Sequence, residues 1–285
     1  MEFCTRLWYS IQHGNKYKIA YCGFSCQQVE MSKSIQEFFQ LLGIKNEQLI
    51  DIRKPTKFRK IIIPEQSFLR NQYYTDEYRL ITDTAYNNID KSNLFPYEKI
   101  YFSRVGFIEK NSPNKECGER EIQDTFKKNG YIILDPEKLT VQEQIFYVKN
   151  CKEFVVIPGG ASANAVFASD HTKRIYIRKA FTTIPDMFQI DQMTNADRVT
   201  FIDCYYEPYK IFPLGYGYGP HFIGKTSEFR SFLKKNNMKQ LNVCVYSFAL
   251  FKTWIWLTKI RIGNLMTAIK IIGKNYLDKI VQLFR

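Results

Sequence analysis

Residues 157–164 have the composition of a phosphate-binding turn. They read Ile-Pro-Gly-Gly-Ala-Ser-Ala-Asn, between an apolar stretch that predicts a strand and a run of small residues that predicts a helix. Glycines let backbone N–H groups approach a phosphate, and a helix N-terminus adds a partial positive charge of about half a unit. On this segment alone, a tight turn without a ligand is the alternative. Neither the G-x-G-x-x-G nor the P-loop pattern is present, which disfavours a dinucleotide oxidoreductase or an NTPase.

Arg104 is a second candidate for a role in binding, because it directly follows the predicted strand Lys-Ile-Tyr-Phe-Ser at 99–103. The planar fork of an arginine can donate two parallel hydrogen bonds, which suits a diphosphate. The carboxyl ends of parallel strands meet at one edge of a sheet, so Arg104 and the glycine turn are expected on the same rim. A solvated or salt-bridged arginine is the alternative.

Alternating strands and helices are expected to position these residues. In the second half, predicted strands at 99–103, 131–134, 154–157, 174–177 and 199–202 alternate with predicted helices at 119–128, 141–149 and 161–168. This alternation predicts an α/β fold with a doubly wound, mainly parallel sheet that binds ligands at the carboxyl ends of its strands.

The first half predicts a smaller α/β lobe. Its expected strands lie at 17–21, 48–52 and 60–63, with one helix ending at Gly43 and another over 75–86. The polar stretch 87–96 is typical of a linker. We therefore expect three parts: an N-terminal lobe at 1–93, a second lobe at 94–240 and a helical tail at 241–285.

The tail is basic and partly apolar. The chain has a formal net charge of +13, of which residues 241–285 contribute +6 from seven Lys and Arg and one Asp. The stretch 243–257 contains Trp254 and Trp256 but is shorter than the roughly 20 residues that span a bilayer. It suits an interfacial helix on anionic lipid, or a helix that packs back on the first lobe. Nucleic acid is disfavoured, because no recognised motif accompanies the charge.

The cysteines and the N-terminus indicate a cytoplasmic protein. Seven cysteines are scattered without paired spacing, which predicts neither a disulfide framework nor a zinc cluster. The first residues lack a basic stretch followed by an apolar run, so no signal peptide is expected.

About 70 residues of the second half resemble glycosyltransferase family 61, whose bacterial members act in capsular and other surface polysaccharide synthesis. The resemblance runs through 99–104, Gly-Glu-Arg-Glu-Ile at 118–122, Gly-Tyr at 130–131, Asp-Pro-Glu at 135–137, 141–145 and 159–167. The first lobe is similar more weakly, at 42–44 and 63–64.

The resemblance implies a GT-B architecture of two Rossmann-like lobes facing across a cleft. It also implies inverting transfer from a nucleotide sugar, usually a UDP-sugar, with no required metal and no other cofactor. By position, Glu119 and Gln144 would shape the nucleotide pocket. Arg104 and the turn would hold the diphosphate, the turn residues being Gly159, Gly160, Ala161, Ser162 and Asn164.

Inversion needs a base that takes a proton from the acceptor hydroxyl. We favour Glu65, which follows a predicted strand end, over Asp76, Glu77 and His13; an ordinary surface carboxylate is the alternative. His171 and His221 are interpreted as structural or exposed. The Gly/Tyr-rich segment 215–221 could cover the sugar or be a plain connection.

The sequence thus predicts a cytoplasmic glycosyltransferase, in peripheral contact with an anionic membrane, that transfers sugar to a glycan or lipid-linked acceptor. Gly118 and Pro158 stand where relatives often carry Asn and His. They motivate one alternative, a non-catalytic nucleotide-sugar or polysaccharide-binding protein of an assembly complex.

Overall fold

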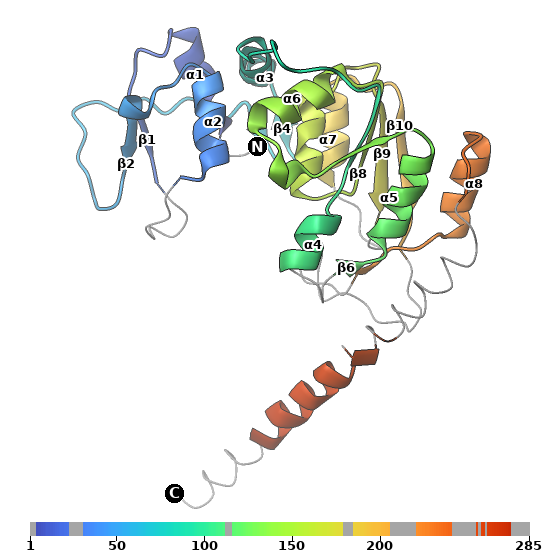
Figure 1. Cartoon of the computed structure of the whole chain (residues 1–285). Coiled ribbons are helices and arrows are strands. Elements are labelled where there is room, and N and C mark those ends of the chain that lie inside the picture. Colours follow the sequence, from blue (N-terminus) through green and yellow to red (C-terminus); the bar gives the residue numbers. More distant parts are fainter. Residues whose placement is uncertain are drawn as a thin grey trace, which may run out of the picture. The chain divides into compact units, whose positions relative to one another are not determined.

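A computed structural model describes residues 4–22, 31–111, 116–178, 185–205, 221–240, 255, 258–259 and 261–274 (Figure 1). The chain divides into two compact units, each described by itself below. The first unit comprises Met1–Ser103, Gly130–Ile177 and Thr183–Phe201, and the second comprises Arg104–Asn129, Arg178–Thr182 and Ile202–Arg285. The three-part division expected from the sequence stays a prediction.

A five-stranded sheet in the order β10-β9-β8-β5-β7 forms the centre of the fold. The pairs β5·β7, β5·β8 and β8·β9 are parallel, which confirms the predicted α/β class. In chain order the strands are arranged 2-1-3-4-5, a doubly wound order whose switch point lies between β5 and β8. The strands are β5 (Lys99–Phe102), β7 (Ile132–Leu134), β8 (Glu153–Val156), β9 (Lys173–Arg178) and β10 (Val199–Asp203).

Alternating side chains of these strands build the main hydrophobic core. Ile100, Phe102, Phe154, Val156 and Tyr176 share it with α6 (Val141–Asn150) and α7 (Pro185–Met193), which lie over one face of the sheet (Figure 1). The rings of Phe102 and Phe154 meet edge to face at 5.2 Å between centroids. Both faces of β8 are buried, which explains its continuous apolar run.

The first helices of the chain pack on the same core. Here α2 (Lys33–Leu41) and α3 (Glu77–Asn87) contact α6, and the ring of Phe38 lies 6.5 Å from that of Phe167 in η5 (Gly160–Phe167). The turn after α2 requires Gly43, whose φ is +74°. Elements on both sides of the expected linker therefore share one core.

The remaining elements of the N-terminal part are short. The parallel pair of β1 (Ile19–Tyr21) and β2 (Leu49–Asp51) confirms two predicted strands. The others are α1 (Leu7–Gln12), η3 (Asn46–Gln48) and the hairpin of β3 (Phe68–Leu69) and β4 (Tyr73–Tyr74).

The predicted strand at 60–63 is wrong. These residues form no strand, and Ile61 and Ile63 are 60% and 70% exposed. Directly after this segment, side chains bind the backbone: Arg6 donates to the carbonyl of Pro64, and the Trp8 indole donates to the carbonyl of Glu65. An apolar run alone does not make a strand when no partner strand lies beside it.

In the second unit, α5 (Glu119–Lys128) packs against α8 (Ser227–Lys235). The ring of Phe126 lies 6.1 Å from that of Phe229 and 6.3 Å from that of Phe232. The bounds of α5 are those predicted from the sequence. The other elements are α4 (Val105–Asn111) and the parallel pair of β6 (Glu116–Cys117) and β11 (His221–Phe222), while η4 (Pro136–Lys138) belongs to the first unit.

The predicted C-terminal tail contains a helix over residues 261–274, whose side chains are exposed. No helix among the described residues is long and apolar enough to cross a membrane. Residues 215–220 and the Trp254 and Trp256 pair, to which we gave ligand and membrane interpretations, lie outside the described residues.

Candidate active site

The glycine turn follows β8 directly and leads into η5. The Ser162 hydroxyl donates to the Gly159 carbonyl at 2.7 Å and accepts from the Gly159 N–H at 3.0 Å. Ser162 is fully buried, so its side chain closes the turn from within. The first N–H groups of a helix have no partner inside the helix, and here they belong to Gly160 and Ala161. The predicted strand and turn are confirmed, and the predicted helix is present as the 3₁₀-helix η5.

A hydrogen bond joins two of the predicted site residues, Gln144 and Asn164. The Asn164 amide donates to Oε1 of Gln144 at 3.1 Å and to the Ala161 carbonyl at 3.1 Å. Gln144 in turn donates to the carbonyl of Pro136 at 2.8 Å. Because Pro136 begins η4, which follows β7, this chain of bonds ties the segments after β7 and β8 together.

The position of Gln144 follows from how α6 begins. Thr140 caps the helix by accepting from the Glu143 N–H at 3.2 Å, and Glu143 accepts from the Thr140 N–H at 2.8 Å. The reciprocal cap fixes the first turn of α6, and Gln144 stands on that turn. The bonded group of Gln144, Asn164 and the glycine turn therefore lies at the carboxyl edge of the sheet, where doubly wound sheets bind ligands.

Arg104 and Glu119 form a separate pair in the second unit. The Arg104 N–H donates to the Glu119 carboxylate at 2.9 Å, and Glu119 is only 4% exposed. Glu119 is the first residue of α5, where the helix dipole favours a negative charge. The turn into α5 requires Gly118, whose φ is +95°. The pair fixes the backbone from which the Arg104 side chain extends.

A half-buried ion pair next to this region was not expected from the sequence. Glu121 and Lys225 lie 3.8 Å apart. Burial raises the pKa of Glu121 and lowers the pKa of Lys225. Glu121 stands in a motif that the sequence singles out, whereas Lys225 has no local pattern and comes to it only through the packing of α8.

Comparison with known proteins assigns the family. Residues 1–175 match the sequence model of the family described as Glycosyltransferase 61. The chain belongs to glycosyltransferase family 61. The match covers more than half of the chain and includes every candidate site residue. No curated protein and no solved structure matches the chain. As predicted, the protein is an enzyme that transfers glycosyl groups.

The candidate bases of this glycosyltransferase lie in the N-terminal part of the first unit. Glu65 is exposed, and its carbonyl accepts from the Trp8 indole at 3.0 Å. His13 stacks on the Tyr9 ring at 4.1 Å and bonds the Tyr9 carbonyl at 2.7 Å, which holds it in place. A hydrogen bond from Thr75 lowers the pKa of Glu77. The assignment of Glu65 as the base stays a prediction.

His171 lies at the opposite edge of the glycosyltransferase sheet from the glycine turn, because it precedes β9. Its ring bonds Asp197 at 3.0 Å and lies 3.7 Å from Asp170. The hydrogen bond to Asp197 and the charge of Asp170 raise the pKa of His171. The side chain is 78% exposed, which suits the structural interpretation.

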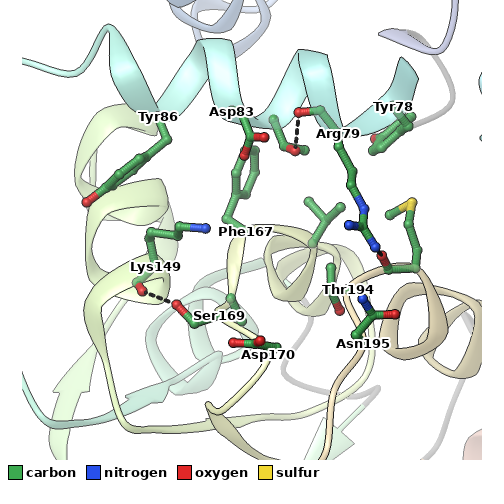
Figure 2. A pocket seen from close by; sticks show the side chains of 14 residues that line it. Tyr78, Arg79, Asp83, Tyr86, Lys149, Phe167, Ser169, Asp170, Thr194 and Asn195 are labelled. Atoms are coloured by element: carbon green, nitrogen blue, oxygen red, sulfur yellow. Dashed lines mark hydrogen bonds between the residues drawn. The ribbon is translucent and has the colours of Figure 1, made fainter. Parts of the chain in front are cut away.

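A pocket of about 290 Å³ also lies toward the amino ends of the strands, between α3, the end of η5 and the end of α7 (Figure 2). Arg79 crosses it and donates to the Met193 carbonyl at 2.8 Å, and Ser169 donates to the Lys149 carbonyl at 3.1 Å. None of the predicted site residues lines this pocket.

Within the described part of the glycosyltransferase, no three His, Cys, Asp or Glu side chains come together as a metal site. Cys4, Cys22, Cys151 and Cys204 form no disulfide bond. Metal independence stays a prediction.

Proposed function

We propose that this family 61 enzyme transfers a sugar from a UDP-sugar to a glycan or lipid-linked acceptor, with inversion and without a metal ion, in the synthesis of a surface polysaccharide such as capsule. The observation that carries the donor half of this proposal is the bonded group at the carboxyl edge of the sheet. There the Gln144–Asn164 bond and the closed turn at Ser162 preorganise residues beside the switch point between β5 and β8.

In this proposal the turn receives the donor diphosphate. When the sugar leaves, negative charge accumulates on the diphosphate, and donors held in place before the reaction stabilise that charge best. The backbone N–H groups of Gly160 and Ala161 are such donors. Asn164 contributes by holding the turn, because its two amide N–H groups bond Gln144 and the Ala161 carbonyl. Ser162 and Gln144 act as positioning residues, because their polar atoms bind the turn and Asn164.

Arg104 supplies the cation. Its guanidinium binds phosphate oxygens, and Glu119 positions it by holding the Arg104 N–H. This role separates the two members of the pair: Arg104 contacts the donor, while Glu119 acts through the backbone.

Transfer proceeds by a single displacement. Glu65 takes the proton of the acceptor hydroxyl, the acceptor oxygen forms a bond to the anomeric carbon, and the bond from that carbon to the diphosphate oxygen breaks. The exposed carboxylate of Glu65 suits contact with an incoming acceptor. A GT-B fold, with residues 1–93 on the acceptor side and 94–240 on the donor side, is part of this proposal.

The helix over residues 261–274 supports peripheral contact with an anionic membrane on its cytoplasmic face. Five apolar residues at helical spacing, each more than half exposed, form one face: Ile262, Leu265, Met266, Ile269 and Ile272. The same segment carries Arg261, Lys270 and Lys274 and no carboxylate. An exposed apolar face with accompanying cations is typical of helices that lie in the interface of anionic bilayers.

The test is to supply a panel of UDP-, GDP- and CDP-sugars as donors and to measure turnover as release of the nucleoside diphosphate. We expect release from a UDP-sugar, and a product whose anomeric configuration, measured by NMR coupling, is opposite to that of the donor. A product that retains the donor configuration contradicts the single displacement, and release from only GDP- or CDP-sugars contradicts the donor assignment.

A further inference from the structure

The N-terminal part of the first unit contains a pocket of about 600 Å³ with apolar walls. It is formed by α1, β1, β2 and the irregular segment 58–64. Its apolar lining includes Leu7, Ile19, Ile50, Phe58, Ile61 and Ile63. This volume lies within the range of pockets that enclose small ligands.

The irregular segment leaves much of its apolar surface in solvent. Ile61, Ile62 and Ile63 are 60%, 40% and 70% exposed, although they are consecutive. The backbone after them is held by the Arg6 and Trp8 side chains, so the isoleucines stand on an anchored segment. Contiguous exposed apolar residues next to a pocket mark a binding surface rather than ordinary surface variation.

Cations surround this apolar surface. Lys18 and Lys60 line the pocket and are exposed, and Arg6 lines it as well. The eight residues 53–60 hold five Lys and Arg and no Asp or Glu. Of these five, Arg53 is engaged by Asp51 at 2.7 Å. The pocket therefore combines apolar walls with a positively charged rim.

We propose that this pocket binds one molecule of an anionic amphiphile, with its hydrocarbon chain against the isoleucines and its phosphate head group at Lys18 and Lys60. A free inorganic anion would make no use of the apolar walls, and an uncharged sugar would make no use of the charge of Lys18 and Lys60. A flat bilayer surface would require no cavity. Charge and shape together thus select a lipid phosphate that enters singly.

The position of the pocket suggests what this ligand is for. Its last lining residue, Pro64, directly precedes Glu65. If the proposed function holds, and Glu65 is the base, the amphiphile is the acceptor, with a hydroxyl of its head group reaching Glu65. The acceptor class would then be a lipid-linked phosphate or phosphosugar rather than a free glycan.

The binding step is tested without any donor, so its failure is distinguishable from failure of the proposed function. Dodecyl phosphate, below its critical micelle concentration, is titrated into the full chain by calorimetry, beside dodecyl maltoside and inorganic phosphate. We expect dodecyl phosphate to bind at least tenfold more tightly than dodecyl maltoside, and inorganic phosphate not to displace it at equal concentration. Equal affinity for the two detergents would overturn the role of the cations.

Variants locate the site. Ala20 lines the pocket and is exposed, so Ala20→Trp should fill the cavity and weaken dodecyl phosphate binding at least tenfold. Lys18→Gln with Lys60→Gln should abolish the preference for phosphate over maltoside. Lys234→Gln with Lys235→Gln removes the same charge from exposed residues of α8, which is not part of this pocket, and should leave binding within twofold.

Folding and bilayer binding are controlled separately. Circular dichroism and calorimetric titration of UDP are repeated on each variant, and the Lys18/Lys60 variant keeps the test valid if Ala20→Trp does not fold. Unchanged dodecyl phosphate binding in both pocket variants refutes the site. A second result would also overturn the proposal. If the protein and both variants bind anionic vesicles equally well but do not bind monomeric dodecyl phosphate, the cations serve a bilayer surface and not a pocket.

Discussion

Removing the hydrogen bond between Gln144 and Asn164 should destabilise the protein by a calculable amount. Gln144 makes bonds at 3.1 Å to Asn164 and 2.8 Å to Pro136, and a longer one at 3.3 Å to Leu139. Only the first two lie within the usual distance range, and each contributes about 0.5–1.5 kcal/mol net. Gln144→Ala should therefore lower the free energy of unfolding by about 1–3 kcal/mol.

A double-mutant cycle isolates the shared bond. Asn164→Ala removes the bonds to Gln144 and to Ala161, so it too should cost about 1–3 kcal/mol. Because both single variants lose the same bond, the double variant should be more stable than additivity predicts by about 0.5–1.5 kcal/mol. Urea unfolding followed by circular dichroism measures all four proteins.

The same variants test positioning of the donor site. If Gln144 and Asn164 hold the turn that receives the diphosphate, Gln144→Ala should raise the Kd for UDP by about fivefold to thirtyfold, which corresponds to about 1–2 kcal/mol. Gln142, on the same helix, accepts from the Asp90 N–H at 3.2 Å and has no place in the bonded group. Gln142→Ala should leave UDP affinity unchanged. A coupling energy of zero, or equal losses of UDP affinity in the two glutamine variants, would refute the reasoning.

Three further expectations concern metal, membrane and pH. Turnover should survive EDTA; activity lost with EDTA and restored by Mg²⁺ or Mn²⁺ would contradict metal independence. Deleting residues 241–285 should release the protein from anionic vesicles, since its six net positive charges contribute about 1 kcal/mol each near the surface; an intact protein that ignores such vesicles at low salt contradicts this. By NMR titration, the pKa of His171 should lie above its ordinary 6.5, and Asp197→Asn should lower it. The small contribution of protonated His171 to folding stability is therefore full below the unfolded pKa and is lost as the pH rises through the folded pKa. A pKa unaffected by Asp197→Asn would contradict the hydrogen bond.

The sheet was predictable because most side chains of β5, β8 and β9, its three central strands, are buried. The apolar residues of β8 (Phe154, Val155 and Val156) and of β9 (Ile175, Tyr176 and Ile177) are consecutive, and the structure places both strands within a residue or two of the expected bounds. Helix α5 was predicted to the residue, with Asn129-Gly130 marking its end. By contrast, α7 mixes its buried Met187 and Ile190 with polar residues, so that only Pro185 at its first position marks the helix locally.

The site was predictable as a set of residues but not as a set of contacts. Gln144 and Asn164 stand 20 positions apart on different elements, and only the packing of α6 against η5 brings them together. The buried position of Ser162 also follows from the turn rather than from its residue type. The wrong strand at 60–63 has the same origin, since strand pairing depends on a neighbour that local sequence does not reveal.

The affinity of UDP relative to uridine, measured by calorimetry in the wild type and in Arg104→Ala, tests the donor site most directly. A hydrogen bond to a charged group contributes about 1.5–3 kcal/mol, so the variant should lose roughly tenfold to 150-fold in UDP affinity and none for uridine. Arg120→Ala is the matched control, because Arg120 is an exposed cation of the same region that pairs with Glu109 at 2.6 Å. Equal losses for UDP and uridine in Arg104→Ala, or a wild type that binds UDP no more tightly than uridine, would contradict the account.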